Sequence, residues 1–289
     1  MTERVGTVVH TAGPFVKTAE PMLEACVNNG TNYMDITGEV PVFEKHFEFY
    51  DRAKTSNCFV VGGMGFDVVP TDCLAKYVAS RVKDPTSLEI VIQTGISPSS
   101  GTLKTMLELA PGGGYRRRND NLEPASVAEE TGSFRFPEGF RTAVSLPLGD
   151  LVTAWHSTGT PNITTYLAVP PGVAALFGTL APFVQGVTRI DFLRRALQWG
   201  VGRIASGPSE EDRREEENWI YARASNKVGE SYEAWLRTPE AYEFTVLSCL
   251  EAIDRIETVN SPGTLTPSGA FGEDFVLELD GTERYDNLP

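Results

Sequence analysis

The stretch VVHTAGPF, residues 8–15, is a short apolar run that ends in a turn of small residues. A strand, a tight loop and a helix follow one another in this way in nucleotide-binding folds. The loop at 11–15 lacks the G-x-G-x-x-G spacing that lets backbone amides contact a pyrophosphate. The stretch is therefore either the front of a dinucleotide-binding domain with a changed loop, or a segment from the middle of such a domain.

The sequence around this stretch alternates between strand and helix patterns. β-branched residues predict a buried strand at 5–12, and Thr18 and Gly30 suit the start and end of the helix that follows. Further strands are expected at 32–37 and 58–63, with a helix at about 42–54 between them. A βαβαβ run of this kind favours a parallel sheet with right-handed crossovers.

Three loops follow the expected strands: TAGPF, DITGE and GGMGFDVVPTD. In parallel sheets, ligands bind beyond the carboxyl ends of the strands. Gly, Asp and Thr are also common turn residues, so a single loop of this kind carries no information. Three of them at one sheet edge favour a binding site.

Composition narrows the class of protein. The chain has 289 residues, a hydrophobic content of 41% and a formal net charge of −14. The hydrophobic content is enough for a packed hydrophobic core. The negative net charge argues against a nucleic-acid partner but is compatible with an anionic cofactor. Four dispersed cysteines indicate a reduced, cytoplasmic setting, and neither a signal peptide nor a membrane span is predicted. The sequence shows no Cys, His or Asp cluster, so we predict no metal site.

Three other motifs need an interpretation. GVGRIA at 200–205 matches a glycine fingerprint, but it follows a helical stretch rather than a strand, and we reject it as a nucleotide loop. GGGYRRR at 112–118 is interpreted as a solvated loop rather than a phosphate site. His156 follows a strand-like run and precedes a polar turn, so it is a candidate general acid, with a structural histidine as the ordinary alternative.

The rest of the chain predicts a second, mixed region. Strands are expected at 87–94, about 142–156 and 162–169, and a helix at 99–110. The apolar helical region at 172–204 suits a membrane surface, a dimer face or core helices equally well.

A hairpin at 218–237, turning near 226–229, comes next. A helix capped by Thr238 follows it, with Pro239 in its first turn. Four apolar residues of this helix share one face: Tyr242, Val246, Leu250 and Ile253.

Several long blocks together resemble the saccharopine dehydrogenase-like oxidoreductases, including their trans-acting enoyl reductase branch. The blocks are VVHTAGPFVKTAEPMLEACVNNGTNYMDITGE, GGMGFDVVPTD, AVSLPLGDLVTAWHSTGTPNI, LRTPEAYEFTVLSCLEAI and TPSGAFGEDFVLEL. The resemblance implies an α/β fold with a Rossmann NAD(P)-binding domain, an inserted α+β domain and a C-terminal segment that returns to the first. The corresponding bounds are 1–83, 84–238 and 239–289.

By this resemblance VVHTAGPF corresponds to the fourth Rossmann strand, which opens the second mononucleotide half. An incomplete, doubly wound parallel domain is therefore expected, lacking its first half and on the order of 60 residues with it. A gene model that starts too late and a genuinely shortened relative are the two explanations, and we favour the first.

The resemblance implies an NAD(P)-dependent oxidoreductase that transfers hydride to or from a C=N, C=O or C=C substrate, with activity impaired by the expected truncation. The cofactor is NADP or NAD. Residues expected to line it are Ala12, Gly13, Pro14, Phe15, Gly38, Glu39, Gly65 and Phe66; Asp67 and His156 are the candidate catalytic residues. A small-molecule substrate is expected, and a homodimer and a peripheral membrane contact both stay open. The rival hypothesis is a non-catalytic pseudo-enzyme or membrane-associated scaffold.

Overall fold

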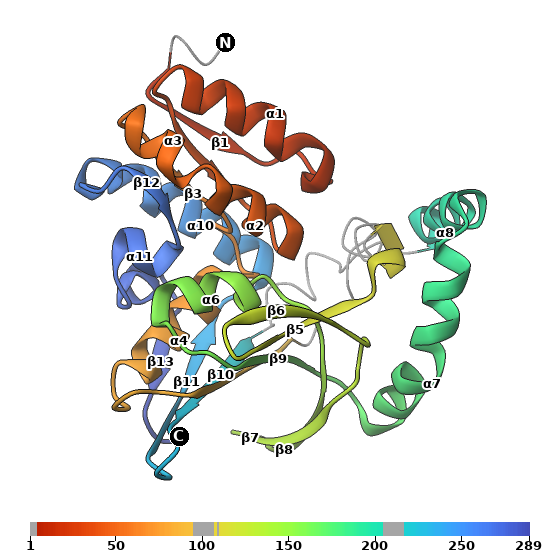
Figure 1. Cartoon of the computed structure of the whole chain (residues 1–289). Helices are drawn as coiled ribbons and strands as arrows, with labels where there is room; N and C mark the ends of the chain where they lie inside the picture. The colour runs from red at the N-terminus through yellow and green to blue at the C-terminus, as the bar shows by residue number, and fades with distance from the viewer. Residues whose placement is uncertain (1–4, 95–106, 109, 205–216) are drawn as a thin grey trace.

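The computed structural model describes residues 5–94, 107–108, 110–204 and 217–289. It forms two sheets joined by helices (Figure 1). The first sheet has the order β1-β2-β3-β12, and all its strand pairs are parallel. Its strands are β1 (Thr7–His10), β2 (Asn32–Asp35), β3 (Phe59–Val61) and β12 (Gly263–Leu265).

Helices cover both faces of this sheet. On one face, α1 (Phe15–Asn28) and α3 (Tyr50–Thr55) pack against Tyr33 and Val60. On the other face, α10 (Ala241–Asp254) buries Phe244 beside Met34 and Val61. Helix α2 (Val40–Glu48) leads from β2 to α3. The parallel βαβαβ arrangement expected from the sequence is confirmed for these elements.

The second sheet is mixed. Its order is β13-β11-β10-β4-β9-β5-β6, and β8 joins it by pairing with β9 and with β7. Its strands are β4 (Ser87–Gln93), β5 (Gly114–Arg118), β6 (Asn121–Ala125), β7 (Thr131–Phe136), β8 (Gly139–Ser145), β9 (Ile163–Ala168), β10 (Asn218–Ser225), β11 (Ser231–Thr238) and β13 (Glu283–Tyr285). Helix α4 (Val69–Ala79) lies between the two sheets and is buried along most of its length. One continuous core therefore links the sheets.

The C-terminal segment contributes to both sheets. The short helix α11 (Pro267–Phe271) follows β12 in the first sheet, and β13 pairs with β11 in the second. The chain thus returns to the first sheet through β12. The bounds that divide the chain after 83 and 238 stay a prediction.

Several expected elements differ in the structure. The run at 146–156 is not a strand, because β8 ends at Ser145 and α6 (Asp150–Thr158) follows. The last long helix begins at Ala241 rather than at Thr238, with the Glu240 carboxylate as its N-cap. Its apolar stripe is exposed, since Tyr242, Val246, Leu250 and Ile253 are 40–58% accessible and the helix buries Phe244, Ser248 and Ala252 instead. Most of the helix expected at 99–110 lies outside the described residues.

The apolar region at 172–204 is confirmed as helical. It forms α7 (Pro171–Thr188) and α8 (Asp191–Ile204), which stand apart from the two sheets as an arm (Figure 1). GVGRI at 200–204 is the end of α8, which confirms that this motif is not a nucleotide loop. Among the described residues, none of the helices has both the length and the apolar character to cross a membrane.

Candidate functional site

The three loops predicted to form a site lie at the carboxyl edge of the first sheet. The parallel register sets His10 opposite Asp35, and Tyr33 opposite Val60, so the strands end at a common level. The loops that leave them span residues 11–14, 36–39 and 62–68. The sheet therefore brings together segments that are more than 20 residues apart in the sequence.

A carboxylate joins the first two loops. Glu39 Oε1 accepts a hydrogen bond from the Phe15 amide at 3.1 Å, and Oε2 accepts one from the Val16 amide at 2.8 Å. These amides belong to the first turn of α1, which begins at Phe15, so Thr18 lies inside the helix and is not its cap. Burial raises the pKa of Glu39, and the two amides oppose that rise. Glu39 thus caps a helix that is distant in sequence.

The second and third loops approach so closely that only glycine fits. A Cβ placed on Gly38 would lie 2.8 Å from Asp67 Oδ2 and 3.2 Å from Asp67 Cβ. Asp67 is accessible to solvent, yet removal of water by the surrounding protein raises its pKa. A side chain that is both accessible and desolvated lies in a concave part of the surface.

The third loop is tied to α10. The Phe66 amide donates to Thr245 Oγ1 at 3.0 Å, and the Phe66 ring meets Phe244 edge-on with 5.9 Å between centroids. The Cβ of a side chain at Gly65 would lie 3.3 Å from Thr245. The two predicted cofactor residues of this loop are therefore held by the C-terminal part of the chain.

Beneath the loops lies a polar network that the sequence analysis did not identify. Asp35 Oδ2 accepts from Tyr33 Oη at 2.8 Å and lies 3.0 Å from His46 Nε2. Asp35 Oδ1 accepts from the Gly63 and Thr37 amides at 3.0 and 3.2 Å. Burial alone would raise the pKa of Asp35, but His46 and the hydrogen-bond donors bring it below its usual value. The sequence signal that could have revealed this network is the polar residue at the end of each apolar strand, His10 in β1 and Asp35 in β2.

Next to Asp67 is a second group of carboxylates. Asp150, at the start of α6, is fully buried, and neither oxygen has a hydrogen-bond partner within the described chain. Burial, reinforced by Asp72 and Asp67, raises the pKa of Asp150 well above its usual value. Asp72 accepts from Ser157 Oγ at 2.7 Å and from the Ser268 amide at 2.8 Å. Asp150 therefore favours its protonated form beside Asp67.

The structure places His156 on α6, in packing between helices. Its ring stacks on Phe47 with 3.4 Å between centroids and meets Trp155 edge-on. Burial, together with the nearby charge of Arg117, lowers the pKa of His156 to about 4. The ring is neutral at neutral pH. Its described contacts favour the structural alternative over general acid catalysis.

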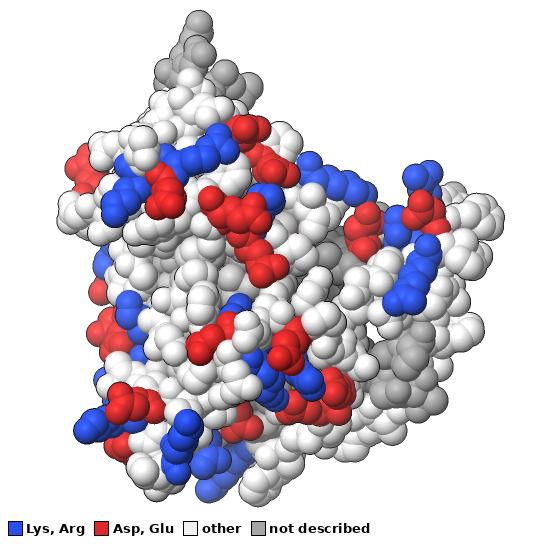
Figure 2. Space-filling model, in the orientation of Figure 1, with Lys and Arg blue, Asp and Glu red and all other residues white. Residues whose placement is uncertain are grey.

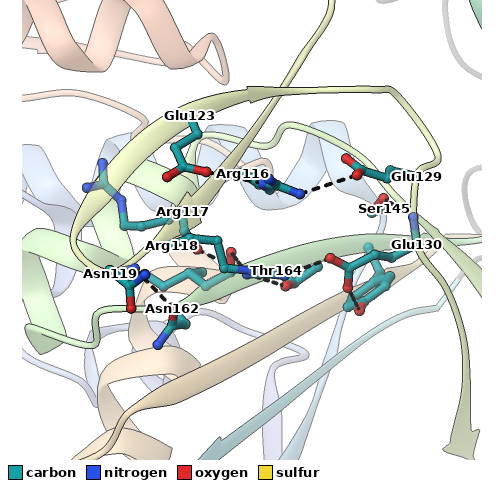
Figure 3. A network of polar contacts seen from close by, with 12 residues as sticks. Arg116, Arg117, Arg118, Asn119, Glu123, Glu129, Glu130, Ser145, Asn162 and Thr164 are labelled. Atoms are coloured by element: carbon teal, nitrogen blue, oxygen red, sulfur yellow. Dashed lines mark hydrogen bonds and ion pairs between the residues drawn. The ribbon is translucent and has the colours of Figure 1, made fainter.

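The arginines of GGGYRRR lie on a strand, β5, and not on a loop. Arg116 pairs with Glu123 at 3.4 Å and Glu129 at 3.2 Å, and Arg118 pairs with Glu130 at 2.6 Å (Figure 3). Arg117 donates to the Leu151 and Asp120 carbonyls. The guanidinium groups of these three arginines are therefore paired with carboxylates or carbonyl oxygens of the same chain. A shallow hollow lies beside this cluster, and its lining includes Arg116, Ser145 and Thr164 but no residue of the three loops.

The described residues fit one part of a dinucleotide better than the other. The loops of β1, β2 and β3 offer a wall beside which a nicotinamide ribose could lie. The α1 amides that would otherwise receive a phosphate already hold Glu39. For a metal ion, the described part of the chain shows no group of three His, Cys, Asp or Glu side chains placed to bind one.

Comparison with known proteins gives relatives of two kinds. No family model matches the chain. A saccharopine dehydrogenase-like oxidoreductase of Rattus norvegicus is 27% identical over 150 residues, which cover 48% of this chain and 35% of that protein. The matches to such oxidoreductases of rat, cattle and mouse span about a third of the relative's length at most.

The second kind of relative aligns over almost the whole chain. A trans-acting enoyl reductase of Mycobacterium ulcerans is 24% identical over 334 residues, which cover 98% of this chain and 80% of that protein. This alignment gives no support to the expected truncation or to an impaired activity.

A solved structure shares the fold. Apo saccharopine dehydrogenase (L-Glu forming) from Saccharomyces cerevisiae matches with a TM-score of 0.57 and 10% identity, covering 98% of this chain and 85% of that chain. At this identity the likeness concerns the fold alone, an α/β arrangement with a parallel first sheet and a mixed second sheet. Together, these comparisons show that the chain is similar in sequence to saccharopine dehydrogenase-like oxidoreductases and trans-acting enoyl reductases, and similar in fold to saccharopine dehydrogenase.

Proposed function

We propose that this protein is an NAD(P)-dependent oxidoreductase that transfers hydride between a nicotinamide and a C=C, C=N or C=O substrate. The observation that carries the proposal is that three loops are held together at one sheet edge. Glu39 joins the first loop to the second, and Gly38 allows the second to approach the third. Thr245 of α10 holds the third loop. Ligands of open parallel sheets bind at this edge. The similarity to a trans-acting enoyl reductase over almost the whole chain supports a C=C substrate as the first candidate.

In this proposal the loops supply a wall for the cofactor, NADP or NAD, which provides the hydride when bound. Ala12, Gly13, Pro14 and Phe15 form the nicotinamide-ribose side. The wall is completed by Gly38, Glu39, Gly65 and Phe66. The two glycines allow close backbone approach, because a side chain at either position would collide with Asp67 or crowd Thr245.

Asp67 is the first candidate for handling a proton. It is accessible, its raised pKa keeps the protonated form available, and the Asp150 carboxyl group beside it is buried. A general acid needs these properties of access and a pKa shifted towards the working pH. His156 is the weaker candidate, because it is neutral and stacked on Phe47.

Titration of the chain with NADPH and with NADH, followed by nicotinamide fluorescence, tests the proposal. We expect saturable binding that Gly38→Ala weakens at least tenfold, because a Cβ there displaces Asp67 from the wall. Phe183→Ser, on the exposed arm, is the matched control and is expected to bind as the parent does. No binding of either nucleotide by the folded parent chain at millimolar concentration would overturn the proposal.

A second candidate function is a non-catalytic scaffold. The observation that favours it is the exposed apolar surface of the arm, where Leu176, Phe183 and Phe192 are 55–76% accessible. In this case a second copy of the chain or a membrane surface covers the arm. Absence of nucleotide binding, combined with self-association or vesicle binding that Phe183→Ser abolishes, would favour the scaffold.

A further inference from the structure

Four titratable side chains form a continuous buried series under the candidate site. His10 Nδ1 lies 3.0 Å from Tyr33 Oη, Tyr33 Oη lies 2.8 Å from Asp35 Oδ2, and His46 Nε2 lies 3.0 Å from the same oxygen. His46, Asp35 and Tyr33 have no accessible surface, whereas His10 keeps 6%. The series therefore runs from the packing of α2 to the carboxyl end of β1, where it comes closest to the surface.

The direction of each hydrogen bond in this series is fixed by its acidic member. Asp35 accepts hydrogen bonds from two amides on Oδ1 and from the Tyr33 hydroxyl on Oδ2, and His46 Nε2 lies 3.0 Å from Oδ2, which suits an ionised carboxylate that only accepts. Burial and the neighbouring Asp35 charge raise the pKa of Tyr33, so its hydroxyl stays protonated. Its proton points to Asp35, and its oxygen is left to accept.

It follows that His10 must donate to Tyr33. The only His10 atom within reach of the hydroxyl is Nδ1, so Nδ1 carries the hydrogen and Nε2 of the neutral ring carries the lone pair. In catalytic histidines, a hydrogen bond at one ring nitrogen likewise fixes the proton state of the other. The buried series thus selects one tautomer of His10.

The position of His10 relates this tautomer to the candidate site. It is the last residue of β1, directly before the loop at 11–14, and its ring meets Phe15 edge-on with 5.3 Å between centroids. Phe15 belongs to the proposed nicotinamide-ribose wall. His10 therefore lies one side chain away from that wall, on the strand that leads into it.

We propose that Tyr33, Asp35 and His46 hold His10 as its Nδ1–H tautomer, so that Nε2 exchanges a proton with the substrate bound at the sheet edge. This inference rests on the proposed function for the identity of the site, but the tautomer does not depend on it. In reduction, the His10 imidazolium gives its Nε2 proton to the substrate atom that has gained an electron pair, and the ring becomes neutral. In oxidation, Nε2 takes up that proton. His10 then takes the proton-transfer role for which Asp67 is the other candidate, and the Asp67 carboxyl group affects the charge at the same sheet edge.

Nitrogen-15 NMR of the imidazole rings of the intact chain tests the tautomer directly. The chain has three histidines, so His156→Asn and His46→Asn assign the three spectra by elimination. We expect the neutral ring of His10 in the parent chain to carry its hydrogen on Nδ1 and not on Nε2. In Tyr33→Phe, whose folding is checked by circular dichroism, we expect a mixture of tautomers. A protonated Nε2 in the neutral ring of the parent, or an unchanged tautomer in Tyr33→Phe, overturns the inference.

Addition of NADPH separates this inference from the proposed function. Where fluorescence shows that the nucleotide binds, the Nε2 resonance of His10 is expected to move while that of His156 does not. Binding that leaves the His10 resonance unmoved overturns its place at the site. Where NADPH does not bind, the proposed function fails, and the tautomer of His10 in the parent and in Tyr33→Phe still decides the inference. Phe183→Ser, on the exposed arm, serves as the folded control for nucleotide binding and for the His10 resonance.

Discussion

Two regions of the molecule reverse the usual distribution of polar and apolar side chains. Under the first sheet edge, His10, Tyr33, Asp35 and His46 are buried polar groups in contact with one another. Along the arm of α7 and α8, large apolar side chains are exposed, and the sequence of α7 contains no charged residue. In Figure 2 the charged side chains of the arm gather over α8.

The difference between the two regions lies in their partners. His10, Tyr33 and Asp35 are joined by hydrogen bonds, and His46 lies 3.0 Å from the Asp35 carboxylate, so much of the cost of removing these groups from water is offset inside the chain. The exposed apolar side chains of the arm gain little from folding, because they stay in contact with solvent. Stability should therefore depend on the first region and hardly on the second, and the following predictions test this contrast.

The largest effect is expected at the centre of the buried series. Asp35→Ala leaves three donors without their acceptor and removes the carboxylate beside His46, in a region that water does not reach, so we expect a loss of about 3–5 kcal/mol in the free energy of unfolding. Urea denaturation followed by circular dichroism measures it. Asp280→Ala, at an exposed position, is the control and should change stability by no more than about 0.5 kcal/mol. Similar values for the two variants would show that the series does not stabilise the fold.

A smaller loss is expected where two loops touch. The Cβ of Gly38→Ala would meet the Asp67 side chain, so we expect a loss of about 1–3 kcal/mol, measured by the same denaturation. Gly6→Ala meets nothing within 4 Å and serves as the control. The double variant Gly38→Ala, Asp67→Ala should lose less than the sum of the two single changes, because the carboxylate that causes the collision is gone. Simple additivity contradicts the close approach.

A third prediction concerns pH and the packing of α6 on α2. The pKa of His156 is about 4 in the folded chain and about 6.5 when unfolded, so between these values only the unfolded chain binds the proton. Stability should fall as the pH drops from 6.5 to 4. Because His156 keeps part of its surface in contact with solvent, screening reduces the effect to about 1 kcal/mol. His156→Asn should lose this part of the acid sensitivity in unfolding curves recorded at several pH values, and an identical pH profile for both chains contradicts the assignment.

The smallest effect on stability is expected on the arm. Phe183 and Phe192 are 69% and 76% accessible, so Phe183→Ser combined with Phe192→Ser should change the free energy of unfolding by no more than about 0.5 kcal/mol. The same variant should bind less of the fluorescent probe ANS, which reports exposed apolar surface. Phe244→Ala, at a fully buried position, is the contrasting control, with an expected loss of about 3–5 kcal/mol. A large loss in the serine variant would mean that the arm contributes to folding.

Sequence patterns identified the parts of the fold that depend on local chemistry. Alternating and β-branched runs gave β1, β2, β3 and β4, and the turn residues near 226–229 gave the hairpin of β10 and β11. The three loops also came together as expected, because parallel strands start and end at matched levels.

Features that depend on distant contacts were not predictable. The run at 146–156 has the apolar residues of a strand, but it folds as α6 and packs against α2 and α4. Similarly, the exposed stripe of α10 could be taken for a core face, since periodicity shows that one side is apolar and not whether anything covers it. The bonds from Glu39 to α1 and the contact between His10 and Tyr33 join residues more than 20 positions apart, and no sequence spacing reveals them.

The carboxylate of Glu39 also affects whether anions from solution can bind at the N-terminus of α1. With Glu39 bonded to its first amides, α1 carries its own covalently attached counter-ion. Sulfate or inorganic phosphate from a buffer would have to displace the Glu39 carboxylate from these amides, and this carboxylate cannot diffuse away. The N-terminus of α1 therefore disfavours adventitious anions. A ligand at this sheet edge is recognised by shape and by the loops that follow β2 and β3.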